Sequence, residues 1–129
     1  MAEGYSDITL DHYESPRNNQ LLEDANAVSA LSNPVCGDKL QLTLRIDREV
    51  VQSAGFTVDG CVAATAAASM MSEMVTGRAL SEAAGLSAEA IDSALGGLPA
   101  GRAHGAQLAA DALATALASF QLSSTGRDR

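Results

Sequence analysis

The two cysteines of the chain, Cys36 and Cys61, are the residues best suited to chemistry, and each lies in a glycine-containing turn beside a carboxylate. The first turn reads NPVCGD over residues 33–38, and the second reads DGC over residues 59–61. Glycine permits the sharp bends that bring a side chain out of a regular element. We interpret this use of cysteine as the placement of thiolates rather than the filling of a core.

Asp38 and His104 are the side chains that could complete a metal site with the two sulfurs. Asp38 follows Cys36 by two positions, and His104 precedes an alanine-rich stretch. Zinc accepts a tetrahedral mixture of sulfur, oxygen and nitrogen ligands. The alternative is two buried, inert cysteines with an ordinary turn aspartate and a solvated histidine. We predict the metal site, with ligands Cys36, Asp38, Cys61 and His104.

Length and composition predict one folded domain over residues 1–129. The sequence has 129 residues, of which 47% are hydrophobic and 3% aromatic, so packing must rely on aliphatic and small side chains. No internal repeat or long linker divides it. We expect an ordered core over about residues 7–122 and a frayed tail over residues 123–129.

The charge balance and the apolar pattern exclude several classes of function. With 16 acidic and 8 basic residues the net charge is −8, which argues against nucleic acid and favours positively charged protein partners. No apolar window is long enough to cross a bilayer, and no signal peptide is recognised, so no membrane role and a cytoplasmic location are expected. Thiols stay reduced there, which makes a Cys36–Cys61 disulfide the weaker interpretation. No nucleotide-binding glycine loop is present, and none of the five serines from Ser53 to Ser87 has a histidine close in sequence that could act as its base.

A β-hairpin is predicted between the two cysteine turns. Leucine and isoleucine at positions 40, 42, 44 and 46 alternate with polar residues, which is typical of a half-buried strand. Residues 47–49 form the turn, and residues 50–58 return. Antiparallel pairing then brings Cys36, just before one strand, close to Cys61, just after the other. An edge strand is expected over residues 27–31.

Helices are predicted on both sides of this hairpin. A short first helix covers residues 7–14 with Asp7 as its cap, and His12 within it is interpreted as a packed or surface residue. Further helices cover 62–76, 81–84, 87–95 and about 106–122, the two short ones starting at serines. The fold class is α+β, a small antiparallel sheet of about three strands packed against several helices. Because Cys61 begins a helix, its thiol is expected to be acidic.

Three motifs, in this order, resemble the U-type iron–sulfur cluster assembly scaffolds, the family of IscU, SufU and the NifU N-terminal domain. DHYESPRN, over residues 11–18, resembles the N-terminal signature of that family. NPVCGD resembles its first cysteine motif, and DGC with the small-residue helix that follows resembles its second. The match covers about residues 7–120, and the short interval between Cys61 and His104 is more similar to IscU than to SufU.

The resemblance implies a scaffold without turnover of its own. Such a protein receives sulfur from a cysteine desulfurase as persulfide, holds a transient [2Fe-2S] cluster or zinc, and passes the cluster to acceptor proteins. Carried over by position, Cys36 and Cys61 are thiolate ligands, Asp38 is a labile carboxylate, and His104 matches the histidine beside the third cysteine of the family. Two thiolates per chain also leave room for a homodimer around a shared cluster.

The chain departs from the family at Gly105, which stands where the third cysteine is expected. The preceding residues 98–102, LPAGR, only partly resemble the family's chaperone-binding stretch. From this pattern we expect Gly105→Cys to tighten cluster retention and Cys36 to accept the sulfur. Two other functions remain open: a zinc-containing sulfur acceptor or regulator of a desulfurase that builds no clusters, and a metal-free interaction domain.

Overall fold

The structure, a computed structural model, describes residues 4–34 and 37–127, with residues 122–127 described by their backbone alone. Within these ranges three strands and five helices follow one another. In chain order they are α1 (Asp7–Glu14), β1 (Ala27–Ser32), β2 (Lys39–Asp47), β3 (Val50–Asp59), α2 (Val62–Val75), α3 (Leu80–Ala84), α4 (Ala88–Ala94) and α5 (His104–Arg127). The predicted α+β class is confirmed.

The three strands form one antiparallel sheet in the order β1-β2-β3. On the face that is covered by helices, Leu42 of β2 pairs with Ser29 of β1 and Phe56 of β3. Leu42 is fully buried, as the alternation along β2 predicted, and its partner Phe56 is fully buried as well. The β2–β3 hairpin turns at Arg48 and Glu49, which both have positive φ angles, 56° and 61°. Two such residues are the signature of a type I′ turn, whose twist matches that of the strands.

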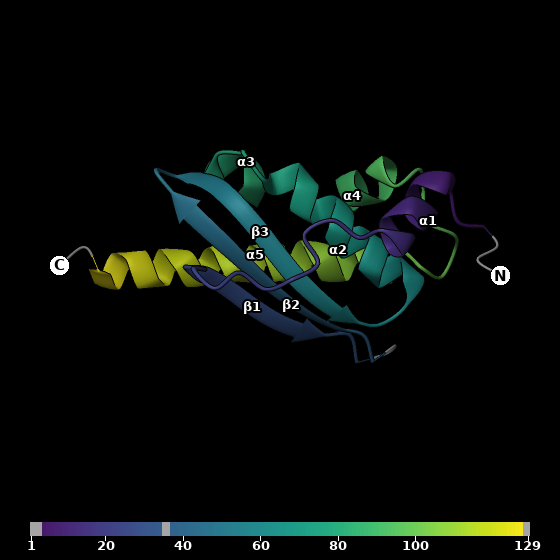
Figure 1. Cartoon of the computed structure of the whole chain (residues 1–129), viewed down its shortest axis with the longest axis horizontal. Helices are drawn as coiled ribbons and strands as arrows, with labels where there is room; N and C mark the ends of the chain where they lie inside the picture. Colours follow the sequence, from purple (N-terminus) through teal and green to yellow (C-terminus); the bar gives the residue numbers. More distant parts are fainter. Residues whose placement is uncertain (1–3, 35–36, 128–129) are drawn as a thin grey trace.

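One face of the sheet is covered by α2 and α5, as Figure 1 shows. Helix α5 packs on β1 and β2, while α2 packs on β3 and on α5. The buried faces of both helices are rich in alanine, and such small side chains let helix backbones approach closely. These alanines are Ala63, Ala64, Ala66, Ala67 and Ala68 in α2 and Ala106, Ala109, Ala112 and Ala116 in α5. Within the described part of the chain, every helix is too short or too polar to span a bilayer.

The opposite face of the sheet is crossed by the segment between α1 and β1, which runs over the strands in Figure 1. Two hydrogen bonds hold it there: the Phe56 N–H donates to the backbone carbonyl of Asn18 at 3.0 Å, and the Leu22 N–H donates to the side-chain oxygen Thr43 Oγ1 at 3.0 Å. Gly55 is a buried residue of β3 beneath this segment. Because it has no side chain, it leaves the space through which the segment passes. The segment thus joins α1 to the sheet.

Helix starts differ from the sequence-based prediction at three places. Ser6, rather than Asp7, caps α1, because its hydroxyl accepts the Thr9 N–H at 3.0 Å. Helix α3 begins at Leu80, one residue before the serine that was predicted to start it, whereas Ser87 caps α4 as predicted. Helix α5 begins at His104, so this histidine lies in the first turn of the helix rather than in the loop before it.

The end of α5 also differs from the prediction. Its backbone is helical through Arg127, whereas a tail was expected from residue 123. No proline interrupts this stretch, so its sequence carries no strong stop signal for a helix.

Helix α1 is held on α2 by a buried polar cluster around His12. The His12 Nδ1 atom lies 2.7 Å from Ser69 Oγ, and that oxygen also accepts the Arg17 N–H at 2.9 Å. The other ring nitrogen, Nε2, lies 3.7 Å from Glu73 Oε1. Burial lowers the pKa of His12, and Arg17 adds to this effect, while Glu73 and Asp11 oppose it. The cluster therefore favours neutral histidine.

We predict that this cluster makes the fold acid-sensitive. Below about pH 6.5 the unfolded chain binds a proton at His12 that the folded chain takes up only at lower pH, so stability is lost as the pH falls. The expected loss between pH 7.5 and pH 5.5 is at most about 1.4 kcal/mol from this residue. Thermal unfolding of the wild type and of His12→Asn at both pH values measures this loss. The Tm of the variant should fall less between pH 7.5 and pH 5.5 than the Tm of the wild type. An equal pH dependence in both proteins would contradict the assignment.

Candidate metal centre

Asp38 lies immediately before β2, where the sheet register places it opposite Gly60. The turn that leads to it is closed by two backbone bonds, from the Asn33 N–H to the Asp38 carbonyl at 2.8 Å and from the Gly37 N–H to the Asn33 carbonyl at 2.7 Å. Lys39 pairs with Asp59 in the sheet, so the residues one step further, Asp38 and Gly60, face each other. The side chain of Asp38 is only 5% exposed.

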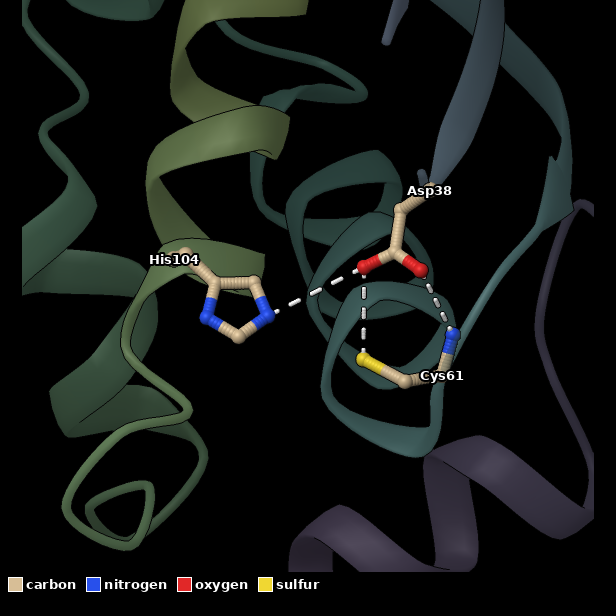
Figure 2. A group of neighbouring side chains, drawn as sticks. All are labelled: Asp38, Cys61 and His104. Carbon is tan, nitrogen blue, oxygen red and sulfur yellow. Dashed lines mark hydrogen bonds and ion pairs between the residues drawn. The ribbon is translucent and has the colours of Figure 1, made fainter. Parts of the chain in front are cut away.

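Cys61 is brought to Asp38 because β3 ends and α2 begins at this point. The Cys61 N–H donates to Asp38 Oδ1 at 3.1 Å, and the Cys61 thiol donates to Oδ2 at 3.4 Å. Gly60 makes this approach possible, since a Cβ atom there would lie 2.6 Å from Asp38 Oδ1. The carboxylate therefore contacts both the backbone and the sulfur of Cys61, as Figure 2 shows.

His104 reaches the same carboxylate from the first turn of α5. Its Nε2 atom lies 3.9 Å from Asp38 Oδ2, and its side chain is 23% exposed. In Figure 2 the imidazole and the sulfur approach the carboxylate from different elements, α5 and the start of α2. The structure thus brings together three of the four predicted ligands, Asp38, Cys61 and His104.

The three donor atoms are spaced for a single metal ion. All lie within 4.8 Å of one another. A tetrahedral zinc ion holds a sulfur and an oxygen ligand about 3.6 Å apart, and a nitrogen and an oxygen ligand about 3.4 Å apart. The Cys61–Asp38 distance of 3.4 Å already matches, and His104 would move inward by about half an ångström from its 3.9 Å. The donor set is one that zinc accepts, and the two distances to Asp38 are close to those of a tetrahedral zinc site.

The thiol of Cys61 is less acidic than the sequence suggested. Burial is the main cause that raises its pKa, and the neighbouring Asp38 carboxylate raises it further. The backbone amides of Ala64 and Ala63, at the start of α2, act in the opposite direction but do not compensate. The predicted acidification by the helix N-terminus is therefore outweighed. A metal that binds here must displace the thiol proton.

Cys36, the fourth predicted ligand, lies outside the described residues, so its predicted proximity to Cys61 stays a prediction. In the sequence it precedes Asp38 by two positions. Sequence reasoning missed the close contacts at Gly60 and Gly105, both of which border the three donors. A glycine beside a cysteine or a histidine was the only signal available, and a glycine in the sequence does not show which atoms lie close to it in the fold.

Comparison with known proteins identifies the family. Residues 4–126 match the NifU-like N terminal domain. The chain belongs to this family. It is 40% identical over 116 residues to the iron–sulfur cluster assembly scaffold protein IscU 1 of Archaeoglobus fulgidus, an alignment that covers 90% of this chain and 76% of the relative. The predicted resemblance to U-type scaffolds is thereby confirmed.

Two further comparisons concern a relative with a named activity and a relative with a solved structure. The zinc-dependent sulfurtransferase SufU of Bacillus subtilis is 37% identical over 83 residues, which cover 64% of this chain and 56% of that protein. The crystal structure of a NifU-like protein (N-terminal) from Brucella abortus superposes with a TM-score of 0.74 at 20% identity, covering 91% of this chain and 94% of the other. The predicted IscU/NifU-like fold is confirmed by this match.

Proposed function

We propose that this protein is an iron–sulfur cluster assembly scaffold or carrier that accepts sulfur from a cysteine desulfurase. The observation that carries the proposal is the convergence of Asp38, Cys61 and His104 at one end of the sheet. Membership in a family whose relatives include an iron–sulfur cluster assembly scaffold supports it. The whole chain, residues 1–129, would act as one domain in the cytoplasm, where both thiols stay reduced.

The ligands proposed for the metal or the cluster are Cys36, Asp38, Cys61 and His104. A [2Fe-2S] cluster is cargo in this function, held transiently and then released to acceptor proteins. Thiolates are the usual cluster ligands, and nitrogen can replace sulfur on one iron. An oxygen ligand such as Asp38 binds iron less firmly than a thiolate, which suits a carrier. Completion of a cluster by a second chain, in a homodimer, is part of the proposal.

Sulfur transfer would use Cys36. Its thiolate attacks the terminal sulfur of the desulfurase persulfide, the sulfur–sulfur bond of that persulfide breaks, and the desulfurase cysteine leaves as a thiolate. The product is a persulfide on Cys36, and no outside oxidant or reductant is consumed. The protein is then the sulfur acceptor in a reaction that the desulfurase catalyses, without a turnover of its own.

A zinc-bound sulfur acceptor or regulator that builds no clusters is the second candidate. Two observations favour it: Gly105 stands where the family's third cysteine was expected, and the three described donors are spaced for one ion. The relative from Bacillus subtilis carries the name of a zinc-dependent sulfurtransferase. In this case zinc would be the resident metal, held by the same residues.

The two candidates are separated by metal and sulfide analysis of protein purified without oxygen. Equal amounts of iron and acid-labile sulfide, lost in a Cys36→Ala variant, would support the scaffold. Zinc alone, together with a desulfurase-dependent persulfide on Cys36, would support the sulfur acceptor. Zinc with a changed desulfurase rate and no persulfide would identify a regulator. Neither metal nor persulfide would overturn both candidates and leave the metal-free interaction domain.

A further inference from the structure

The first turns of α2 and α5 are in direct backbone contact at Gly105. This glycine is buried, and a Cβ atom added to it would lie 2.7 Å from the carbonyl carbon of Ala63 and 2.9 Å from its oxygen. The same atom would lie 2.9 Å from the nitrogen of Ala64. All three are backbone atoms of α2, so no side-chain rotation can relieve the overlap. Only glycine is compatible with this helix–helix distance.

The contact lies between two of the predicted metal ligands. His104 is the neighbour of Gly105 in the first turn of α5, and Cys61 precedes Ala63 by two residues at the start of α2. Asp38 lies between the two donors, 3.4 Å from the sulfur and 3.9 Å from the imidazole nitrogen. Any change in the spacing of the two helix starts therefore changes the distance from His104 to the other donors.

We propose that Gly105 is a positioning residue: its missing side chain lets α5 rest on the backbone of α2 and thereby brings His104 to Asp38 and Cys61. The inference deepens the proposed function and rests on it for the metal. To restore an ordinary contact of 3.4 Å from 2.7 Å, the first turn of α5 must retreat by about 0.7 Å. The His104–Asp38 distance is already longer than zinc requires, so a retreat opposes binding.

The same contact sets which ligands the site can use. A cysteine at position 105 would have to place its Cβ atom in the overlap before its sulfur could reach a metal. The expectation that Gly105→Cys tightens cluster retention is therefore reversed: the substitution separates His104 from the other donors while it adds a thiol. Gly105 thus leaves the imidazole of His104 as the donor on this side of the centre, which favours the second candidate of the proposed function, a single ion bound by oxygen, nitrogen and sulfur.

The test uses the full chain, freed of metal by a chelator and compared with a Gly105→Ala variant. Alanine normally stabilises a helix relative to glycine, so a Gly105 without steric neighbours would give a higher Tm in the variant. We expect a lower Tm and at least a tenfold weaker affinity for Co²⁺, the probe, measured from its visible absorption. Gly85→Ala is the matched control, because Gly85 has a φ of −89° and its nearest neighbour would lie 3.6 Å from the added carbon. That control should keep the Tm and the Co²⁺ affinity of the wild type or raise the Tm.

His104→Ala separates positioning from folding. This variant removes the donor but leaves the helix contact, so it should weaken Co²⁺ binding without the loss of Tm expected for Gly105→Ala. A Gly105→Ala protein with unchanged or higher Tm and unchanged Co²⁺ affinity would overturn the inference. If the wild type binds no Co²⁺, the proposed metal function fails and the positioning role falls with it. The Tm difference then still decides whether the helix contact exists.

Discussion

Replacing Asp38 by alanine is expected to weaken the binding of Zn²⁺ or Co²⁺ at least about 100-fold, or about 2.8 kcal/mol. The carboxylate is the group that the other two donors share, since Oδ2 lies 3.4 Å from Cys61 Sγ and 3.9 Å from His104 Nε2. Its removal takes away an anionic ligand and the contact that orients the thiol. Titration of the metal-free protein with Co²⁺, with zinc as competitor, measures the change.

Asp38→Asn is the matched variant, because it keeps the shape of the side chain and an oxygen that can accept the Cys61 N–H. The loss of charge should still weaken metal binding, but the metal-free protein should keep nearly the wild-type Tm. The alanine variant also loses the hydrogen bond to the Cys61 N–H and should be less stable by about 1–2 kcal/mol. Co²⁺ affinity that is unchanged in both variants would show that the metal is bound elsewhere.

The sheet could be predicted because its signal is local. Along β2 every second residue from position 40 to 46 is leucine or isoleucine. The side chains of Leu40, Leu42 and Leu44 are buried, as this pattern predicted. The hairpin followed from two such strands separated by a short charged stretch. Antiparallel pairing then placed the residue before β2 opposite the residue after β3, which is how Asp38 meets Cys61. This half of the site was implicit in the sequence.

The other half depends on contacts between segments that are distant in sequence. The position of His104 is determined by the distance between α2 and α5, and that distance depends on Gly105 meeting the backbone of Ala63. A glycine in the sequence shows that a side chain is absent but does not show what fills the space. The helix start was misplaced as well, because Gly105 is a poor helix former and delayed the predicted start to residue 106.

The acidity of Cys61 could not be judged from its position in the sequence. A helix N-terminus favours the thiolate, and the amides of Ala63 and Ala64 do act in that direction. Burial and the Asp38 carboxylate act more strongly, and both arise from the folded arrangement of three elements. The sequence shows the helix start and the carboxylate, but it does not show which effect is larger.

Gly55→Ala is the substitution with the largest expected effect on stability, a loss of about 3 kcal/mol. A Cβ atom at this buried position would lie 2.1 Å from the backbone oxygen of Gln20, in the segment that crosses the outer face of the sheet. That segment would be displaced, and with it the hydrogen bond from the Phe56 N–H to Asn18. Because the segment connects to α1, the contacts of α1 with α2 should weaken too.

The sign of the Gly55→Ala effect is the informative result, and equilibrium unfolding in urea measures it. Glycine in the interior of a strand normally lowers the stability of the folded protein by about 0.5–1 kcal/mol relative to alanine. If nothing lay against Gly55, the alanine variant would therefore be more stable than the wild type. Ser53→Ala, two residues earlier on β3, controls for the addition of an alanine to this strand and should change stability little. A Gly55→Ala protein as stable as the wild type would mean that residues 15–26 do not lie against β3. A large loss would show that this crossing segment, which carries part of the N-terminal motif, is held in place by the sheet that also positions Asp38.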